Sequence, residues 1–219
     1  MRNVLGLLLM LVGALLGTVA TAHATVTLGN TTVADQFTIN EPGGCIGGCI
    51  PIGQAGYIVN TTAPNMIVSA GEYKFTFLGA GDSFLPNMFS VAGGGTFCSQ
   101  AVAGCNGGVA SVIGSSFVMN LAAGDIPFTF TADVGGTACQ INNSSTTNAL
   151  PNTGCASYFV GLGSGGVGYI GLTDQAYPGD HDFQDLAVMV RGVPEPASLA
   201  LFGTALTGLL MLRRRHGSI

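Results

Sequence analysis

Three segments of the chain alternate polar and apolar side chains with a period of two residues. They are residues 72–77, 127–131 and 186–191, the last with a second face that is also partly apolar. Successive side chains of a β-strand point to opposite faces of a sheet, so this alternation is typical of strands that are buried on one face. Glycine accounts for 35 of the 219 residues and, with Asn, Asp and Pro, separates such segments. The pattern predicts short strands joined by tight turns.

Further stretches of the same kind predict strands at residues 32–39, 57–60, 65–68, 88–91, 109–113, 116–121, 158–162 and 169–172. Away from the two ends of the chain, no segment shows the period of a helix of useful length. Many short strands with glycine-rich turns favour an all-β fold, an antiparallel β-sandwich or jelly roll. Residues 25–192 hold all of these strands, have the size of one domain and show no internal repeat.

The N-terminal segment, residues 1–24, has the order of a secretory signal peptide. Arg2 gives it a positive start, an apolar run follows, and Ala22 and Ala24 supply the small-x-small pattern of a cleavage site. We therefore expect the mature chain to begin at Thr25. An uncleaved N-terminal membrane anchor is the alternative interpretation.

The C-terminal segment, residues 193–219, has three parts in sequence. The parts are the motif Pro194, Glu195 and Pro196, an apolar stretch over residues 197–212, and the cluster Arg213, Arg214 and Arg215. The stretch is somewhat shorter than the ~20 residues of a typical transmembrane helix. The arginines would hold its end in the cytoplasm by the positive-inside rule, so the rest of the chain would lie outside the membrane. A terminal arginine cluster does not belong in a GPI signal.

This order of motif, helix and arginines closely resembles the PEP-CTERM sorting signal of Gram-negative bacteria. The resemblance covers residues 193–215, about a tenth of the chain. It implies recognition by an exosortase-type membrane protease, transient anchoring in the inner membrane, removal of the tail, and delivery to the cell surface or extracellular matrix. A plain C-terminal anchor without processing is the alternative.

All six cysteines lie between the two terminal segments, which fits an exported chain in an oxidising compartment. An even number of cysteines in such a chain indicates disulfides, for which several pairings are open. We expect neighbours to pair, because each neighbouring pair encloses a loop rich in small or polar residues. The expected pairs are Cys45 with Cys49, Cys98 with Cys105, and Cys139 with Cys155. A cysteine metal site is the alternative, but the spacing lacks a regular zinc-ribbon pattern.

Three aspartates, Asp180, Asp182 and Asp185, precede the last predicted strand. Carboxylate oxygens at short spacing suit a hard cation such as Ca²⁺, although this spacing is not that of an EF-hand loop. The segment resembles the Asp-rich stretch before the final strand in many secreted β-sandwich proteins that carry this sorting signal. That resemblance implies a calcium-stabilised loop with the three aspartates as ligands, which Asp174 could join. The alternative is that they cap turns and keep a sheet edge soluble.

Charged side chains are scarce, with six Lys and Arg against eleven Asp and Glu. We expect no nucleic-acid partner, because neutralising phosphates requires clustered cations. Residues 161–166 match a dinucleotide-binding motif but precede a predicted strand, whereas that motif requires a helix, so we interpret them as a hairpin turn. No pattern identifies a nucleophile with its base, and we expect no catalytic residues.

These observations predict an exported, non-catalytic protein of the cell surface or extracellular matrix that contributes to envelope, biofilm or exopolysaccharide structure. One alternative is a calcium-dependent carbohydrate-binding module, which the absence of Trp weakens. In such a module the tyrosines would stack on sugar rings: Tyr57, Tyr73, Tyr158, Tyr169 and Tyr177. The other alternative is an extracellular hydrolase, for which Glu72 is the residue to test.

Overall fold

The structure is a computed structural model of the chain. It describes residues 24–29, 31, 35–40, 49–59, 64–81, 83, 85–133, 136, 138–143, 156–175 and 182–194. The unit that holds the sheets runs from Ala24 to Val193. In the described part of the chain no helix has the length and hydropathy needed to cross a membrane. The predicted signal peptide and the predicted C-terminal helix lie outside the described residues.

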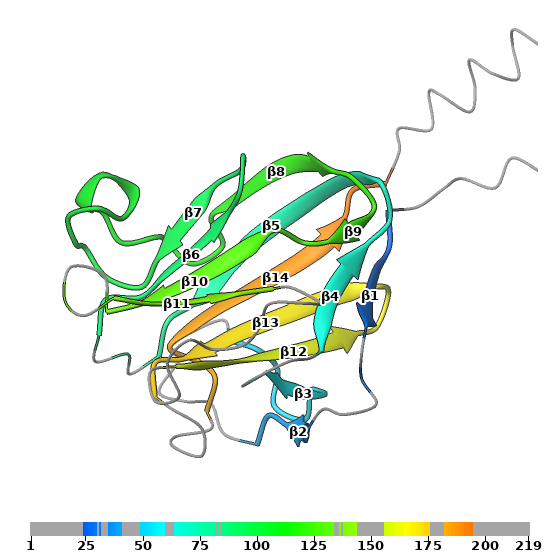
Figure 1. The fold of residues 1–219 in the computed structure, drawn as a ribbon, viewed down its shortest axis with the longest axis horizontal. Helices are drawn as coiled ribbons and strands as arrows, with labels where there is room; N and C mark the ends of the chain where they lie inside the picture. Colours follow the sequence, from blue (N-terminus) through cyan, green and yellow to red (C-terminus); the bar gives the residue numbers. More distant parts are fainter. Residues whose placement is uncertain are drawn as a thin grey trace, which may run out of the picture. The chain divides into compact units, whose positions relative to one another are not determined.

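The described strands form three sheets, and every pairing between strands is antiparallel (Figure 1). The seven-stranded sheet has, in order, β2 (Asp35–Thr38), β3 (Ala55–Val59), β12 (Ser157–Gly163), β13 (Val167–Thr173), β14 (Leu186–Gly192), β5 (Gly71–Gly79) and β8 (Ser116–Leu121). The four-stranded sheet has β11 (Cys139–Asn142), β10 (Phe128–Ala132), β6 (Met88–Val91) and β7 (Thr96–Cys98). The three-stranded sheet has β1 (Val26–Gly29), β4 (Asn65–Val68) and β9 (Gly124–Asp125).

An aromatic core joins the four-stranded sheet to the seven-stranded one. The ring centroids of Phe75 and Phe89 lie 6.2 Å apart, and those of Phe77 and Phe97 lie 5.6 Å apart. All four rings are buried. Aromatic pairs at such distances contribute about 0.5–1.5 kcal/mol each beyond the burial of their surface. The two sheets therefore pack face to face as the layers of a sandwich.

The fold class predicted from the alternation is confirmed. The three alternating segments lie in β5, β10 and β14, and the apolar side of β5 is buried at every second residue. The strands predicted at residues 57–60, 65–68, 88–91, 116–121, 158–162 and 169–172 are also present, with bounds that differ by at most two residues. The predicted hairpin turn is present too, because Gly163 pairs with Val167 across a turn between β12 and β13.

The strand predicted at residues 109–113 is wrong, because this segment belongs to a loop between β7 and β8. Gly108 and Gly114 bracket it with φ angles of +86° and +83°, which reverse the chain direction and do not occur in a regular strand. The loop is tied to β7, where the Ser111 N–H donates to the Cys98 carbonyl oxygen over 2.9 Å. The apolar run that suggested a strand is exposed at Val109 and Val112 instead.

One disulfide joins Cys98, at the end of β7, to Cys105 in the same loop, with the two Cα atoms 6.0 Å apart. This confirms the neighbour pairing for these two cysteines. Cys49 and Cys139 are disulfide-bonded as well. The partners predicted for them, Cys45 and Cys155, lie outside the described residues, so those two pairings stay predictions.

A buried amide links the three-stranded sheet to the end of β11. Asn143 Oδ1 accepts a hydrogen bond from the Met66 N–H over 2.8 Å, and its Nδ2 donates to the carbonyl oxygens of Met66 and Ile126 over 2.8 and 2.9 Å. The side chain is buried. It therefore pairs the Met66 N–H, and it gives a second hydrogen bond to two carbonyl oxygens that the Ile126 and Phe128 N–H groups already bond.

Candidate functional site

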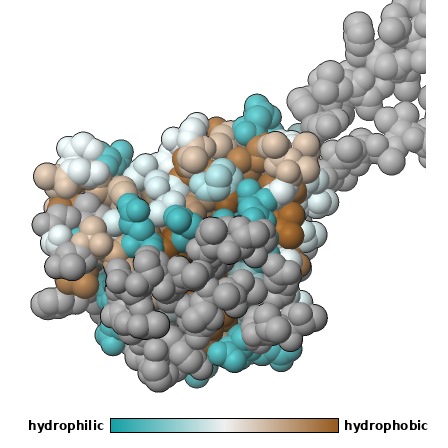
Figure 2. All heavy atoms as spheres, in the orientation of Figure 1, coloured by the Kyte–Doolittle hydropathy of each residue, from teal (hydrophilic) through white to brown (hydrophobic). Residues whose placement is uncertain are grey.

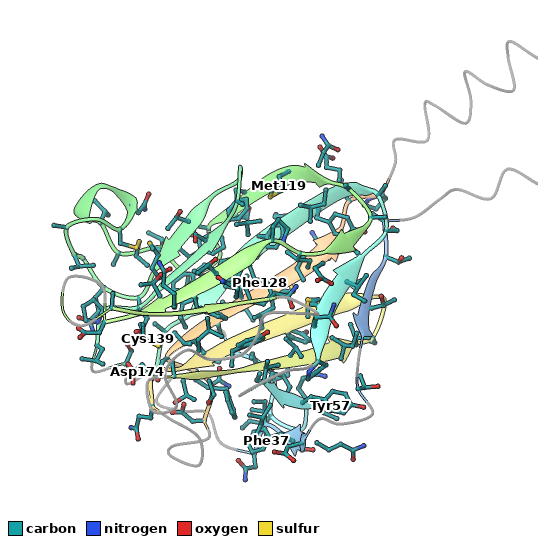
Figure 3. The ribbon with its side chains drawn as sticks, viewed as in Figure 1. Phe37, Tyr57, Met119, Phe128, Cys139 and Asp174 are labelled. Atoms are coloured by element: carbon teal, nitrogen blue, oxygen red, sulfur yellow. A yellow bond between two sulfur atoms is a disulfide. The ribbon has the colours of Figure 1, made fainter. Side chains whose placement is uncertain are left out.

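Three carboxylates approach one another where β13 ends and β14 begins. Asp174 directly follows β13, and Asp182 and Asp185 lie in the segment that leads into β14. Because β13 and β14 are antiparallel neighbours, the end of one strand lies beside the start of the other. Figure 3 labels Asp174 at this end of the sheet. We call Asp174, Asp182 and Asp185 the acidic cluster.

Hydrogen bonds to the backbone fix the position of two of these carboxylates. Asp185 Oδ2 accepts from the Asp174 N–H over 2.7 Å, and Asp182 Oδ1 accepts from the Gln184 N–H over 3.2 Å. The Asp185 N–H in turn donates to the Leu172 carbonyl oxygen over 3.0 Å. The alternative role as turn caps is therefore present in the structure. Asp182 and Asp185 are buried, with 8% and 7% of their surface exposed. The alternative that they keep a sheet edge soluble is therefore wrong for these two residues.

Burial raises the pKa of Asp185 from 3.8 to about 8, because removal from water disfavours the charged carboxylate. Repulsion from Asp174 and Asp182 raises it further, while the backbone hydrogen bond from Asp174 opposes the change. A buried carboxyl in this position is either protonated or balanced by a nearby cation. The acidic cluster therefore has the electrostatics of a site that gains from binding positive charge.

Asn87 contacts the acidic cluster from the other layer of the sandwich through its amide nitrogen. It directly precedes β6 and is fully buried. Its Nδ2 donates to Asp174 Oδ2 and to Ser83 Oγ, both over 2.9 Å. Its Oδ1 has no hydrogen-bond partner among the described residues. An unpaired buried amide oxygen is costly, and amide oxygens are common ligands of Ca²⁺.

The described side chains do not complete a metal site by themselves. Among these residues, no group of three or more His, Cys, Asp and Glu side chains is arranged to hold a metal ion. Asp180, one of the three predicted ligands, lies outside the described residues. The carboxylates of Asp174, Asp182 and Asp185 nevertheless fit a hard cation in chemistry. Nothing in the sequence near Asn87 indicated that it would take part.

The two ends of the domain lie side by side (Figure 1). A Cβ added to Gly192, the last residue of β14, would overlap the carbonyl oxygen of Ala24. The Thr25 N–H donates to Ser69 Oγ over 3.0 Å, and the Val193 N–H donates to the Glu72 carbonyl oxygen over 2.8 Å. The predicted signal cleavage site and the start of the sorting segment are therefore neighbours in space. Ala22 lies outside the described residues.

The tyrosines expected to stack on sugar rings do not form one exposed surface. Tyr73 and Tyr158 are fully buried, and their hydroxyl groups donate to the carbonyl oxygens of Thr25 and Asn142. The prediction is wrong for these two residues, which belong to the aromatic core. Tyr57 and Tyr169 are half-buried, and Tyr177 lies outside the described residues.

An open groove of about 550 Å³ lies beside β2 and β3, and Tyr57 is one of the residues that line it. Figure 3 labels Tyr57 and Phe37 at this part of the domain. Gln36, Thr38 and Thr27 add amide and hydroxyl groups, and none of the lining side chains is charged. A groove with an aromatic ring and neutral polar groups suits a neutral polar ligand. The residues come from separate strands, so no local sequence pattern predicted it.

Comparison with known proteins identifies one feature. Residues 192–215 match the PEP-CTERM protein-sorting motif. No curated protein and no solved structure matches the chain. The motif indicates an exported protein that is sorted and processed at its C-terminal end by an exosortase, a membrane protease. The predicted sorting signal is thereby confirmed, although Glu195, Pro196 and the three arginines lie outside the described residues.

Proposed function

We propose that the protein is a non-catalytic component of the cell surface or extracellular matrix and contributes to envelope, biofilm or exopolysaccharide structure. The observation that carries this proposal is the sorting motif directly after the last strand of a disulfide-bonded β-sandwich. Only Val193 lies between the end of β14 at Gly192 and Pro194, the first residue of the motif. The sandwich is therefore attached at one end by a very short connection.

Within the domain, the acidic cluster and the start of the sorting segment lie at opposite ends of β14. β14 leads from the acidic cluster at Asp185 to Gly192, beside Ala24. Seven strand residues at about 3.3 Å each separate the two by roughly 20 Å. The acidic cluster is thus at the end of the strand that points away from the sorting segment.

We further propose that Ca²⁺ binds at the acidic cluster. The proposal rests on the burial of Asp182 and Asp185 and on the raised pKa of Asp185. A bound divalent cation would balance the buried carboxylates and hold β13, β14 and the segment before β6 together. Asp180 supplies a further carboxylate in this proposal.

The structural role is tested by complementation in a host strain that lacks the protein. Wild-type protein and the exposed-site variant Glu72→Gln should both restore the amount of matrix retained by the cells. The Glu195→Ala variant, changed within the sorting motif, should leave the matrix depleted and the protein misplaced. Failure of Glu72→Gln to restore the matrix, with normal levels of the protein, would contradict the non-catalytic role and favour the hydrolase.

The groove beside β2 and β3 favours carbohydrate binding as a second candidate function. The uncharged lining and the ring of Tyr57 suit a neutral polysaccharide. Retention of the protein on the host's own exopolysaccharide should fall with Tyr57→Ala and persist with Tyr169→Ala, the other half-buried tyrosine, which does not line the groove. Equal retention of both variants would place sugar binding elsewhere and remove this support.

A further inference from the structure

β8 is the last strand of the seven-stranded sheet and pairs on one side only, with β5 (Figure 1). The register of this pairing is continuous over all six residues of β8, from Ser116 opposite Thr76 to Leu121 opposite Gly71. Phe117 and Met119 point into the sandwich, where the Phe117 ring stacks on Phe75 with centroids 5.0 Å apart. One long side of β8 is therefore held firmly, and the other is an edge.

The edge of β8 presents backbone groups that the domain does not use. The Phe77 N–H donates to the Ser115 carbonyl oxygen over 2.9 Å, which makes these residues a hydrogen-bonded pair. Hydrogen-bonded and non-hydrogen-bonded pairs alternate along an antiparallel ladder. The backbone N–H and C=O groups of three residues therefore form no hydrogen bond to β5 and point toward the open side of the strand. These residues are Ser116, Val118 and Asn120. Within the described part of the chain these groups form no other hydrogen bond.

Nothing in the sequence of β8 protects this edge. Natural sheet edges are commonly blocked by charged side chains, proline, bulges or very short strands. β8 reads Ser-Phe-Val-Met-Asn-Leu, without charge or proline, and its register shows no bulge. The edge strand at the other end of the same sheet, β2, has only four residues and begins with Asp35. The two edges of the sheet are therefore not equivalent.

Exposed aliphatic side chains continue from β8 into the loop before it. Val118 is 50% exposed, Ile113 47% and Val112 74%. Two backbone hydrogen bonds hold the loop in place. The Gly114 N–H donates to the Phe77 carbonyl oxygen over 2.8 Å, and the Ser115 N–H donates to the Val112 carbonyl oxygen over 2.9 Å. Figure 2 shows hydrophobic residues reaching the surface of the domain among hydrophilic ones. Aliphatic groups fixed beside a free edge favour contact with another protein surface.

We propose that the β8 edge is an interface for a second copy of this chain, paired antiparallel with Val118 opposite Val118. In this register Ser116 of each copy faces Asn120 of the other. All three outward-pointing residues then fall in hydrogen-bonded pairs, so every free N–H and C=O of both edges is used at once.

The edge of β8 is complementary to itself, which favours a second copy as the occupant. Its free groups are centred on Val118, so a two-fold axis at this residue makes the edge complementary to itself. No charged side chain of β8 opposes its own copy across the axis, and the two valines pack together at the centre. The pairing joins the two seven-stranded sheets into one and leaves the sorting segments, after β14, attached to separate copies.

Light scattering on the protein recovered from the host's surface or medium tests the interface. The wild-type protein should have the mass of a dimer. Val118→Lys should weaken the dimerisation constant by about tenfold or more, because two cations would face each other across the axis. Asp35→Lys, an exposed change on the opposite edge strand β2, should leave the dimerisation constant unchanged. A monomeric wild type, or a Val118→Lys variant that stays dimeric, would overturn the proposal.

A cysteine pair tests the register itself. Antiparallel bonded pairs place Cα atoms about 5.5 Å apart, which a disulfide can span. Mild oxidation should therefore link two copies of the Val118→Cys variant, and a reducing agent should release them. Ser116→Cys is the matched control. Residue 116 of one copy lies opposite residue 120 of the other, so the two introduced cysteines are too far apart to form a disulfide. Equal linkage of both variants, or none with Val118→Cys, would contradict this pairing. A foreign strand on the same edge would give a larger complex that contains one copy only, which also contradicts it.

Discussion

Acidification is expected to stabilise the calcium-free domain, because of a single buried carboxyl. Asp185 has a pKa of about 8 in the folded protein and an ordinary value of 3.8. Between these values the folded chain holds a proton on Asp185 that the unfolded chain has lost. The free energy of unfolding therefore rises as the pH falls from about 8 toward 4, and this contribution is lost again as the pH rises through the folded-state pKa.

The size of the effect follows from the width of this pH range. A group that is protonated in one state and ionised in the other changes the free energy of unfolding by about 1.4 kcal/mol per pH unit. From pH 7 to pH 5, two units inside the range, the expected gain in the free energy of unfolding is about 3 kcal/mol. This is a large fraction of the total stability of a typical domain.

Urea unfolding in the presence of a chelator, at a series of pH values, measures this contribution. Asp185→Asn keeps an oxygen that can accept the hydrogen bond from the Asp174 N–H, but its side chain does not titrate. The free energy of unfolding of this variant should therefore not show the rise at lower pH that Asp185 gives the wild type. Asp35→Asn changes an exposed carboxyl on β2 and should keep the slope of the wild type. If the free energies of unfolding of the wild type and of Asp185→Asn differ by the same amount at every pH from 5 to 7, the reasoning is refuted.

Three further predictions concern calcium and the packing of the domain. Chelation should lower the melting temperature of the native protein, and Asp182→Asn should abolish the response to added Ca²⁺; an identical melt with and without chelator would contradict the calcium site. Asn143→Ala should lower the free energy of unfolding in urea by about 1–3 kcal/mol, because it leaves the Met66 N–H without its partner; a loss well below this would contradict the bridging role. Gly192→Ala should destabilise the domain by about 1–3 kcal/mol in the same assay, because its Cβ would overlap Ala24; an unchanged midpoint would show that the two ends are not in contact.

Local patterns were sufficient for much of the fold. In β5 the period of two placed Tyr73, Phe75 and Phe77 on one face, and all three are buried. The same pattern already contradicted the idea that Tyr73 stacks on a sugar, because a residue on the core face of a strand is not exposed. The Cys98–Cys105 disulfide followed from nearness in sequence, which limits the loop that it closes.

Features that depend on contacts between distant segments could not be predicted in this way. Asn87 reaches Asp174 across 87 positions, and nothing near Asn87 in the sequence marks it as a partner of the acidic cluster. The apolar run at residues 109–113 resembles a strand locally, but its flanking glycines and its bonds to β7 make it a loop. The burial of Asp185 likewise depends on how β13 and β14 pack, so its raised pKa could not be read from residue order.

The intact mass of the native protein, recovered from the surface or medium of its host, tests the central claim most directly. The account predicts a chain that begins at Thr25, ends close to Pro194, Glu195 and Pro196, and is lighter than the reduced chain by the hydrogens of its six cysteines. That result would establish export, processing of the sorting segment and complete disulfide formation together. A full-length chain with free thiols would contradict the proposed location of the protein, and with it the proposed function.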